Sequence, residues 1–213
     1  MNMNDFIFSN KLKCELQFLL DNPTKLPGSL CLYGNPGNGK TSFANYLAHE
    51  IGAEVQYFDA NSFKIDRTSS NSVLQSINDS FRTISLNQFI KGNEHLRMKP
   101  YDRVFIIDEF HNSTEQTQDS YKVAVEEISK KDCIFIFILN TDLNDKHGSY
   151  EKRVTPAMRS RFYSIDFDVK EIQVDEVCKQ VQIKYPKVPD ELVRNLVRES
   201  DFRQLTMRAK MIG

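Results

Sequence analysis

The chain has 213 residues, with 28 lysines and arginines, 29 aspartates and glutamates, and a formal net charge of −1. This length suits one domain, or a main domain with a small appendage. Hydrophobic residues make up 40% and charged residues 27% of the sequence, which is ordinary for a globular protein in water. The near-neutral charge argues against wholesale coating of nucleic acid, although it allows a local basic patch.

The sequence carries no signal of export or membrane insertion. No apolar run approaches the ~20 residues that cross a bilayer, and the opening MNMNDFIFSN lacks the basic segment of a signal peptide. The four cysteines lie far apart, without the spacing of a zinc site or a paired redox motif. We therefore expect a cytoplasmic location, no membrane partner, and reduced, mostly buried thiols.

Strands and helices are expected to alternate along most of the chain. Short apolar runs predict strands at 29–33, 53–60, 103–108, 133–140 and 163–167. Helical periodicity predicts helices at 10–20, 42–52, 71–90 and 114–129, and a short helix around 156–162. Continuous apolar strands that alternate with helices indicate an α/β fold, with a parallel sheet covered on both faces.

The pattern changes near Val169, after which only helical segments are expected: 174–185, 189–200 and 201–213. This change predicts a boundary between an α/β nucleotide-binding core over residues 1–168 and a small helical lid domain over residues 169–213.

The octet GNPGNGKT, residues 34–41, fits the P-loop pattern, and the strand and helix expected around it supply the context that the pattern requires. Its glycines let the backbone approach phosphates, while the following helix presents free N–H groups. Lys40 is expected to reach the β- and γ-phosphates of ATP, and the Thr41 hydroxyl to hold Mg²⁺. The residues expected to bind the nucleotide are Asn35, Pro36, Gly37, Asn38, Gly39, Lys40, Thr41 and Ser42. The alternative is a glycine turn with a chance Lys-Thr.

Two acids and an amide follow the apolar strands. Because ligands bind at the carboxyl ends of parallel strands, Asp108 and Glu109 are expected to face the same crevice as the P-loop. Asp108 is expected to contact Mg²⁺, and Glu109 to deprotonate the attacking water. Asn140, at the end of the next strand, could hold that water or sense the γ-phosphate; the alternatives are a surface cap for the acids and a turn residue for Asn140.

The set GNPGNGKT, VFIIDEF, FILN, RSRF and SDFR, in this order, resembles the AAA+ ATPases, and within them the clamp-loader branch, especially the ATPase subunit of T4-like phage clamp loaders. The resemblance covers nearly the whole chain. It implies a P-loop NTPase with a five-stranded parallel sheet between helices and a helical lid. It also implies an ATPase of DNA replication in a bacterial or phage-infected cell, which couples Mg-ATP hydrolysis to remodelling of a sliding clamp or another DNA-bound partner.

The resemblance assigns roles to two arginines. Arg161, in Ser160-Arg161-Phe162, matches the arginine finger that reaches into the ATP site of a neighbouring subunit, with Phe162 in place of the usual Cys and Arg159 as a rival candidate. Arg203, in DFRQL, matches the sensor 2 arginine, which contacts the γ-phosphate in its own subunit. An arginine that acts in trans implies a homo- or hetero-oligomer.

Several features depart from cellular clamp loaders. Their N-terminal Tyr-Arg-Pro segment is missing, so adenine is expected to contact the chain near Asp5–Phe8. Asp59 and Asn61 both remain candidates for the polar switch residue after the second strand. Clamp loaders continue into a helical collar, whereas this sequence ends at Gly213. A minimal homologue, a truncated chain and a different AAA+ protein therefore all remain open.

Basic residues flank the predicted 71–90 helix and could contact DNA phosphates, namely Lys64, Arg67, Lys91, His95, Arg97 and Lys99. A solvated charged face explains them about as well. Two alternatives to a clamp loader keep the same motifs. One is a helicase loader or viral replication initiator of the AAA+ class. The other is a nucleotide-gated binding module with little turnover.

Overall fold

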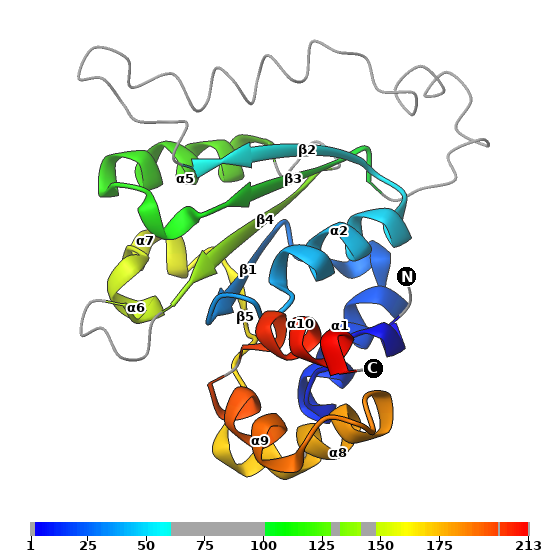
Figure 1. The fold of residues 1–213 in the computed structure, drawn as a ribbon. Helices are drawn as coiled ribbons and strands as arrows, with labels where there is room; N and C mark the ends of the chain where they lie inside the picture. The colour runs from blue at the N-terminus through cyan, green and yellow to red at the C-terminus, as the bar shows by residue number, and fades with distance from the viewer. Residues whose placement is uncertain (1–2, 61–100, 129–132, 142–147, 200, 213) are drawn as a thin grey trace, which may run out of the picture.

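The computed structural model describes residues 3–60, 101–128, 133–141, 148–199 and 201–212 (Figure 1). Five strands form one sheet: β1 (Ser29–Gly34), β2 (Glu54–Asp59), β3 (Arg103–Asp108), β4 (Cys133–Asn140) and β5 (Tyr163–Asp166). The strand order is β2-β3-β4-β1-β5, and every neighbouring pair is parallel. The predicted five-stranded parallel sheet is confirmed.

Helices cover both faces of this sheet (Figure 1). One face carries α1 (Asn10–Asp21) and α2 (Lys40–Ile51), and the other carries α5 (Glu115–Ile128), α6 (Tyr150–Arg153) and α7 (Pro156–Arg159). Three further helices, α8 (Val174–Lys184), α9 (Asp190–Arg198) and α10 (Phe202–Ile212), lie beyond the β5 end of the sheet.

Alternation along the buried strands divides the apolar side chains between two cores, because successive residues of a strand point to opposite faces. On β4, Ile134 and Ile136 join the core beneath α1 and α2, while Phe135 and Phe137 join the core beneath α5 and α7. Both faces of the central strands are therefore buried, which explains why their sequences read as continuous apolar runs.

The opening helix has the local signals that its sequence predicts. Ser9 precedes α1, and its Oγ accepts a hydrogen bond from the Leu12 N–H at 3.3 Å, so the first turn is capped. The buried side chains Leu12, Leu16 and Leu19 form one stripe that faces the sheet. This packing fixes the path of the N-terminal segment towards the edge of the sheet.

Helices α8, α9 and α10 share a third hydrophobic cluster, in which Val181, Val193 and Leu205 are completely buried. The three helices predicted after Val169 are present, and their cluster is distinct from the two cores of the sheet. The division of the chain at residue 168, and a lid role for these helices, remain predictions.

Other expectations have mixed outcomes. Cys31, Cys133 and Cys178 are buried free thiols, whereas Cys14 is exposed. The predicted 71–90 helix, Asn61 and the six basic residues around that helix lie outside the described residues. Within the described ranges, every helix is too short or too polar to span a bilayer.

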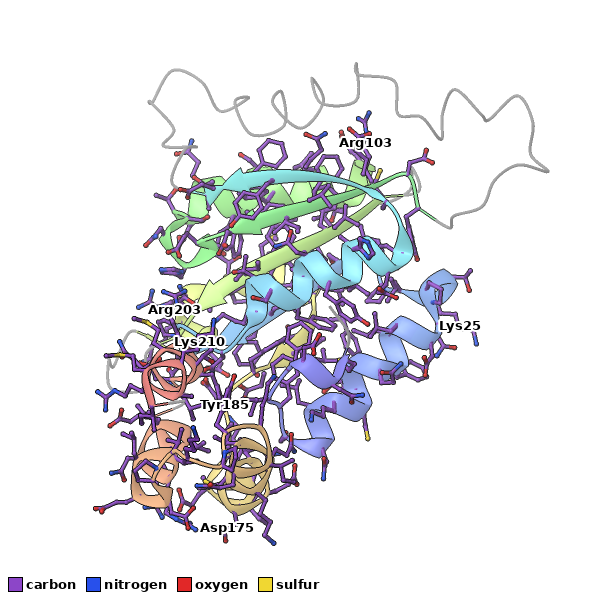
Figure 2. All side chains as sticks on the ribbon, turned by 45° about the vertical axis from the view of Figure 1, so that its right-hand side comes forward. Lys25, Arg103, Asp175, Tyr185, Arg203 and Lys210 are labelled. Atoms are coloured by element: carbon purple, nitrogen blue, oxygen red, sulfur yellow. The ribbon has the colours of Figure 1, made fainter. Side chains whose placement is uncertain are left out.

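At the amino end of the sheet, the buried Arg103 of β3 has its Nε 3.5 Å from Oε2 of Glu54 (Figure 2).

Replacing Phe137 by Ala should destabilise the fold by about 3–5 kcal/mol, because removal of this fully buried ring leaves a cavity that the neighbouring side chains cannot fill. The Phe137 ring contacts the rings of Phe110 and Phe162, each with centroids 4.8 Å away. Urea unfolding measures the loss. The matched control is Phe18→Ala, since Phe18 is 60% exposed and its loss should change stability by about 0.5 kcal/mol or less. Equal losses in the two variants would contradict the described core.

Candidate active site

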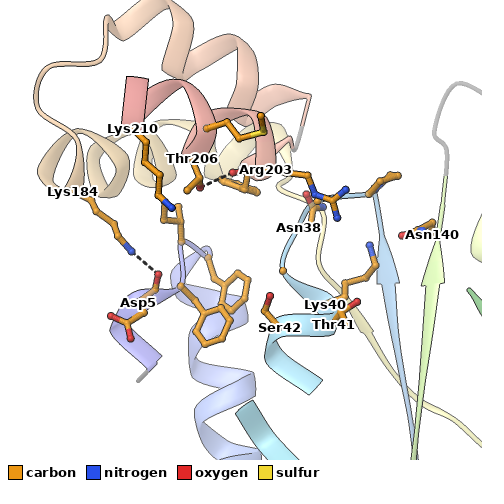
Figure 3. Close-up of a pocket in the computed structure, with 18 of the residues that line it drawn as sticks. Asp5, Asn38, Lys40, Thr41, Ser42, Asn140, Lys184, Arg203, Thr206 and Lys210 are labelled. Atoms are coloured by element: carbon orange, nitrogen blue, oxygen red, sulfur yellow. Dashed lines mark hydrogen bonds between the residues drawn. The ribbon is translucent and has the colours of Figure 1, made fainter. Parts of the chain in front are cut away.

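A cavity of about 780 Å³ opens at the carboxyl edge of the sheet, bounded by the start of α2, the N-terminal segment and α10 (Figure 3). Its size is typical of small-molecule sites. The residues that line it include most of those predicted for nucleotide binding and hydrolysis: Pro36, Gly37, Asn38, Gly39, Lys40, Thr41, Ser42, Asp108, Glu109, Asn140 and Arg203.

The register of the sheet brings these residues together. Gly34, the first residue of the P-loop, ends β1 and pairs with Asn140 on β4. Asp108 ends β3, on the opposite flank of β4, and pairs with Asp59 on β2. Since β1, β3 and β4 run in parallel, their polar ends emerge at one edge. Asp59, one of the two switch candidates, lies at the same edge on β2.

The P-loop takes a shape that depends on glycine. Gly37 and Gly39 have φ angles of 87° and 83°, in the left-handed region that disfavours side chains. A Cβ on Gly37 would also lie 3.2 Å from the Cβ of Arg203. Helix α2 begins directly after Gly39, earlier than its sequence predicted, so its first N–H groups point into the cavity region.

Lys40 is the buried cation of the site. Its side chain is only 4% exposed, and its Nζ donates to the carbonyl oxygens of Gly34 at 2.9 Å and Asn35 at 2.7 Å. Burial lowers the pKa of Lys40 to about 8, although the carboxylates of Asp168 and Asp108 act in the opposite direction. The Lys40 ammonium is therefore bound by two backbone carbonyls of its own loop.

The side chains of Asp108 and Thr41 bring two oxygen atoms together. The Thr41 hydroxyl donates to Oδ2 of Asp108 at 3.1 Å, the Tyr57 hydroxyl donates to the same oxygen, and the Glu109 N–H donates to Oδ1 at 2.8 Å. Hydroxyl and carboxylate oxygens are the ligand types that Mg²⁺ prefers. Among the described residues, no group of three or more His, Cys, Asp or Glu could hold a metal.

Glu109 has a left-handed backbone with φ of 55°, which costs about 1–3 kcal/mol in a residue other than glycine and persists where the surroundings fix it. Its Oε1 accepts from Nδ2 of Asn140 at 3.3 Å, and its Oε2 lies 3.2 Å from Nε2 of His111. Burial, followed by the neighbouring Asp108, raises the pKa of Glu109. A carboxylate with a raised pKa at such a position is suited to accept a proton from water.

His111 contributes a contact that the sequence did not reveal. Its Nδ1 accepts the N–H of Asn140 at 3.3 Å, so the proton of the neutral ring belongs on Nε2, the atom that faces Glu109. Burial lowers the pKa of His111, which favours this neutral form. His111 thereby connects the end of β4 with Glu109.

The far end of the cavity is formed by the segment predicted to contact adenine. Asp5, Phe6, Ile7 and Phe8 line it, and the Phe6 and Phe8 rings stack with centroids 5.0 Å apart. A Cβ on Gly39 would lie 3.5 Å from the Phe8 ring, in ordinary van der Waals contact, so Phe8 lies close to the P-loop.

Helices α8 and α10 bring cations to this cavity. Arg203 and Lys210 lie on α10, between the sheet and α9 (Figure 2), and Lys184 of α8 donates to the carbonyl oxygen of Asp5 at 2.5 Å (Figure 3). Arg203 was predicted from its motif, whereas Lys184 and Lys210 were not, because isolated lysines on amphipathic helices carry no recognisable pattern.

Two predicted residues lie apart from the cavity wall. Asn35 does not line it, because its N–H donates to Asp168. Arg161 precedes β5, and its carbonyl oxygen accepts from the Ser29 hydroxyl at 2.5 Å, at the amino end of β1. Its guanidinium Nε donates to Oε1 of Glu126 at 2.8 Å. The rival Arg159 also lies outside the cavity wall, with its Nη1 donating to the carbonyl oxygen of Glu151 at 3.0 Å.

A P-loop between a parallel strand and a helix, with acids at the end of β3 and a polar residue at the end of β4, defines an AAA+ P-loop NTPase fold. Comparison of the sequence with known protein families gives the same result. Residues 30–165 match the ATPase family associated with various cellular activities (AAA), and the chain belongs to that family.

Known proteins resemble the chain in sequence or in fold. A stretch of 63 residues, 28% of this chain and 20% of the relative, is 32% identical to the Holliday junction branch migration complex subunit RuvB of Mycoplasmopsis pulmonis. The structure of the RuvB Holliday junction branch migration motor of Thermotoga maritima matches with a TM-score of 0.53 and 17% identity, over 92% of this chain and 60% of that chain. The replication initiator DnaA bound to AMPPCP and single-stranded DNA matches with a TM-score of 0.59 and 18% identity, over 99% of this chain and 64% of that chain.

The chain thus spans less than two thirds of each of these structures. At such identities the structural likeness shows the fold. These relatives support the AAA+ family, and the clamp-loader branch stays a prediction.

Replacing Lys40 by Met tests the electrostatics of the nucleotide-free site. Between pH 8 and 10.5 the unfolded chain binds more protons than the folded one, because the pKa of Lys40 is about 8 in the fold against an ordinary 10.5. The cost of burying the charge is fully present below pH 8 and is relieved as the pH rises. The stability of the wild type should therefore rise relative to Lys40→Met by about 1–3 kcal/mol between pH 7 and 10. Urea unfolding at both pH values measures the difference. If the stability of the wild type relative to Lys40→Met stayed constant or fell between these pH values, the burial of the Lys40 amine would be contradicted.

Proposed function

We propose that this protein binds Mg-ATP in the cavity and hydrolyses it, within an oligomer that acts on DNA or on a DNA-bound partner. One observation carries the proposal: Lys40, the Thr41–Asp108 pair and the Glu109–Asn140 pair all face a single cavity of about 780 Å³. Membership of a family of ATPases supports the same activity.

The residues present fit a magnesium-bound triphosphate. The N–H groups at the start of α2 and the Lys40 ammonium supply donors and positive charge for phosphate oxygens. For that contact, Lys40 would exchange the carbonyl oxygens of Gly34 and Asn35 for phosphate. Thr41 and Asp108 would hold Mg²⁺, which when bound neutralises negative charge on the phosphate oxygens. The segment Asp5–Phe8 would contact adenine.

Hydrolysis requires a general base that deprotonates the attacking water, and we assign this role to Glu109. Its carboxylate would accept a proton from water while the water oxygen bonds to the γ-phosphorus and the bond between that phosphorus and the bridging oxygen breaks. ADP and inorganic phosphate are then the products. Asn140, which donates to Oε1 of Glu109, would orient the carboxylate or the water. Arg203, on the wall of the same cavity, would contact the γ-phosphate.

Arg161 is proposed to act on the ATP of a neighbouring copy. It lies beside Ser29, and Ser29 and Gly34 are the two ends of β1, roughly 17 Å apart along an extended strand. The side chain of Arg161 therefore cannot serve the P-loop of its own chain. An arginine finger supplied by another subunit stabilises the charge of the transferring phosphoryl group, an effect worth about 10³-fold or more in rate.

The finer proposal is a clamp-loader-like ATPase, with ATP hydrolysis coupled to remodelling of a sliding clamp in the cytoplasm of a bacterial or phage-infected cell. Its support is the sequence motif set, since the RuvB and DnaA likenesses concern other DNA-processing proteins of this fold. In this scheme residues 169–213 act as a lid over the nucleotide. A helicase loader or replication initiator would use the same site on a different partner.

A mixing experiment tests both hydrolysis and the finger in trans. Glu109→Gln removes the base but keeps Arg161, while Arg161→Ala removes the finger but keeps the base, so each variant alone should lose at least about 10²-fold of the ATPase rate. Mixed in equal amounts, they create intact sites at about one interface in four. Phosphate release from the mixture should thus recover part of the wild-type rate.

The control is Arg159→Ala, which should keep most of the activity if Arg161 is the finger. A mixture as inactive as its components would contradict action in trans. A wild-type protein that binds ATP without releasing phosphate would instead favour the nucleotide-gated binding module.

A further inference from the structure

Asp168, two residues beyond the end of β5, connects the P-loop with the segment that leads to α8. Its side chain is buried, with the residue 8% exposed. Its Oδ1 accepts from the backbone N–H of Asn35 at 2.6 Å and from Nδ2 of Asn38 at 2.7 Å. Hydrogen bonds to a carboxylate are among the stronger ones in proteins, so this single oxygen fixes two residues of the loop.

The surrounding contacts keep Asp168 in this position. Its own N–H donates to Oδ1 of Asp166 at 3.0 Å, and Nδ2 of Asn38 also reaches the carbonyl oxygen of Phe167 at 3.3 Å. Gly34 has φ of 141°, and a Cβ there would lie 2.9 Å from Oδ1 of Asp168. The loop and the carboxylate therefore fit together only because residue 34 has no side chain.

The negative charge of Asp168 does not favour phosphate binding. A carboxylate near the P-loop repels phosphates and attracts the Lys40 ammonium, which already has carbonyl partners in the loop. Burial raises the pKa of Asp168, whereas the N–H of Asn35 and the Lys40 charge stabilise the ionised form. The carboxylate is thus explained by the geometry that it imposes and not by attraction for the nucleotide.

We infer that Asp168 is a positioning residue, which holds Asn35 and Asn38 so that the P-loop keeps the shape that binds phosphate. The inference rests on the proposed function, because it concerns the affinity of the same site. It also has a structural consequence. Asp168 lies in the connection from β5 to α8, and α9 and α10 follow α8. The same two hydrogen bonds therefore link the P-loop to the part of the chain that carries Arg203.

Two substitutions separate geometry from charge. Asp168→Asn keeps an acceptor oxygen for Asn35 and Asn38 but removes the negative charge, whereas Asp168→Ala removes the acceptor as well. Titration with a fluorescent ATP analogue in Mg²⁺ should give a Kd about 10–100-fold higher for Asp168→Ala, as is usual when a supporting partner of a ligand site is lost. Asp168→Asn should bind as tightly as the wild type, or more tightly.

A control variant excludes general loss of stability as the cause. Val125→Ala also removes buried atoms, but from the core beneath α5, on the face of the sheet away from α2. Its Kd should equal that of the wild type. An Asp168→Ala protein that binds like the wild type would overturn the inference. A Val125→Ala protein with the same weakening would overturn it too, and so would an Asp168→Asn protein as weak as Asp168→Ala.

Hydrogen exchange of the nucleotide-free protein tests the contact without reference to ATP. The Asn35 amide should exchange faster in Asp168→Ala than in the wild type, and Asp168→Asn should restore its protection. Unchanged exchange in Asp168→Ala would overturn the inference. If the wild type bound no nucleotide at all, the proposed function would fall, and the Asn35 exchange alone would decide whether Asp168 holds the loop.

Discussion

The parallel register of β1, β3 and β4 is the constraint on which the rest of the structure depends. Gly34 and Asn140 are register partners on β1 and β4, and on the other flank of β4 the strand β3 ends at Asp108, one residue after the Ile107–Phe137 pair. The P-loop, the acids and the amide meet only because three strands point the same way and finish at one edge. The two cores enforce this arrangement, since a slip of one residue would turn every buried side chain of a strand to the wrong face.

Three charged groups at this edge have partners within the protein. Lys40 is held by loop carbonyls, Asp108 by the hydroxyls of Thr41 and Tyr57, and Glu109 by Asn140. A buried charge without a partner is expensive, so these contacts make the site compatible with a stable fold. Phosphate and magnesium would replace some of them.

Sequence patterns predicted the fold and part of the candidate site for clear physical reasons. Apolar runs and glycines report burial and backbone shape, so the sheet and the P-loop were predictable, and Asp108 followed from its place at a strand end. Contacts made by residues outside a motif gave no such signal. Asp168 lies beside the P-loop, and His111 beside Asn140, only through tertiary packing. The role proposed for Arg161 rests on family resemblance, because no pattern within one chain can show what a second copy contributes.

The residues that converge at the sheet edge are proposed to form one Mg-ATP site, and titration calorimetry with Mg-ATP tests this most directly. The wild type should bind about one nucleotide per chain, Lys40→Ala should lose at least about tenfold in affinity through loss of the phosphate cation, and omission of Mg²⁺ should weaken binding of the wild type. The Phe18→Ala protein should bind as the wild type does, since that side chain is exposed on α1. Absence of binding by the wild type, or an affinity indifferent to both Lys40 and magnesium, would contradict the account.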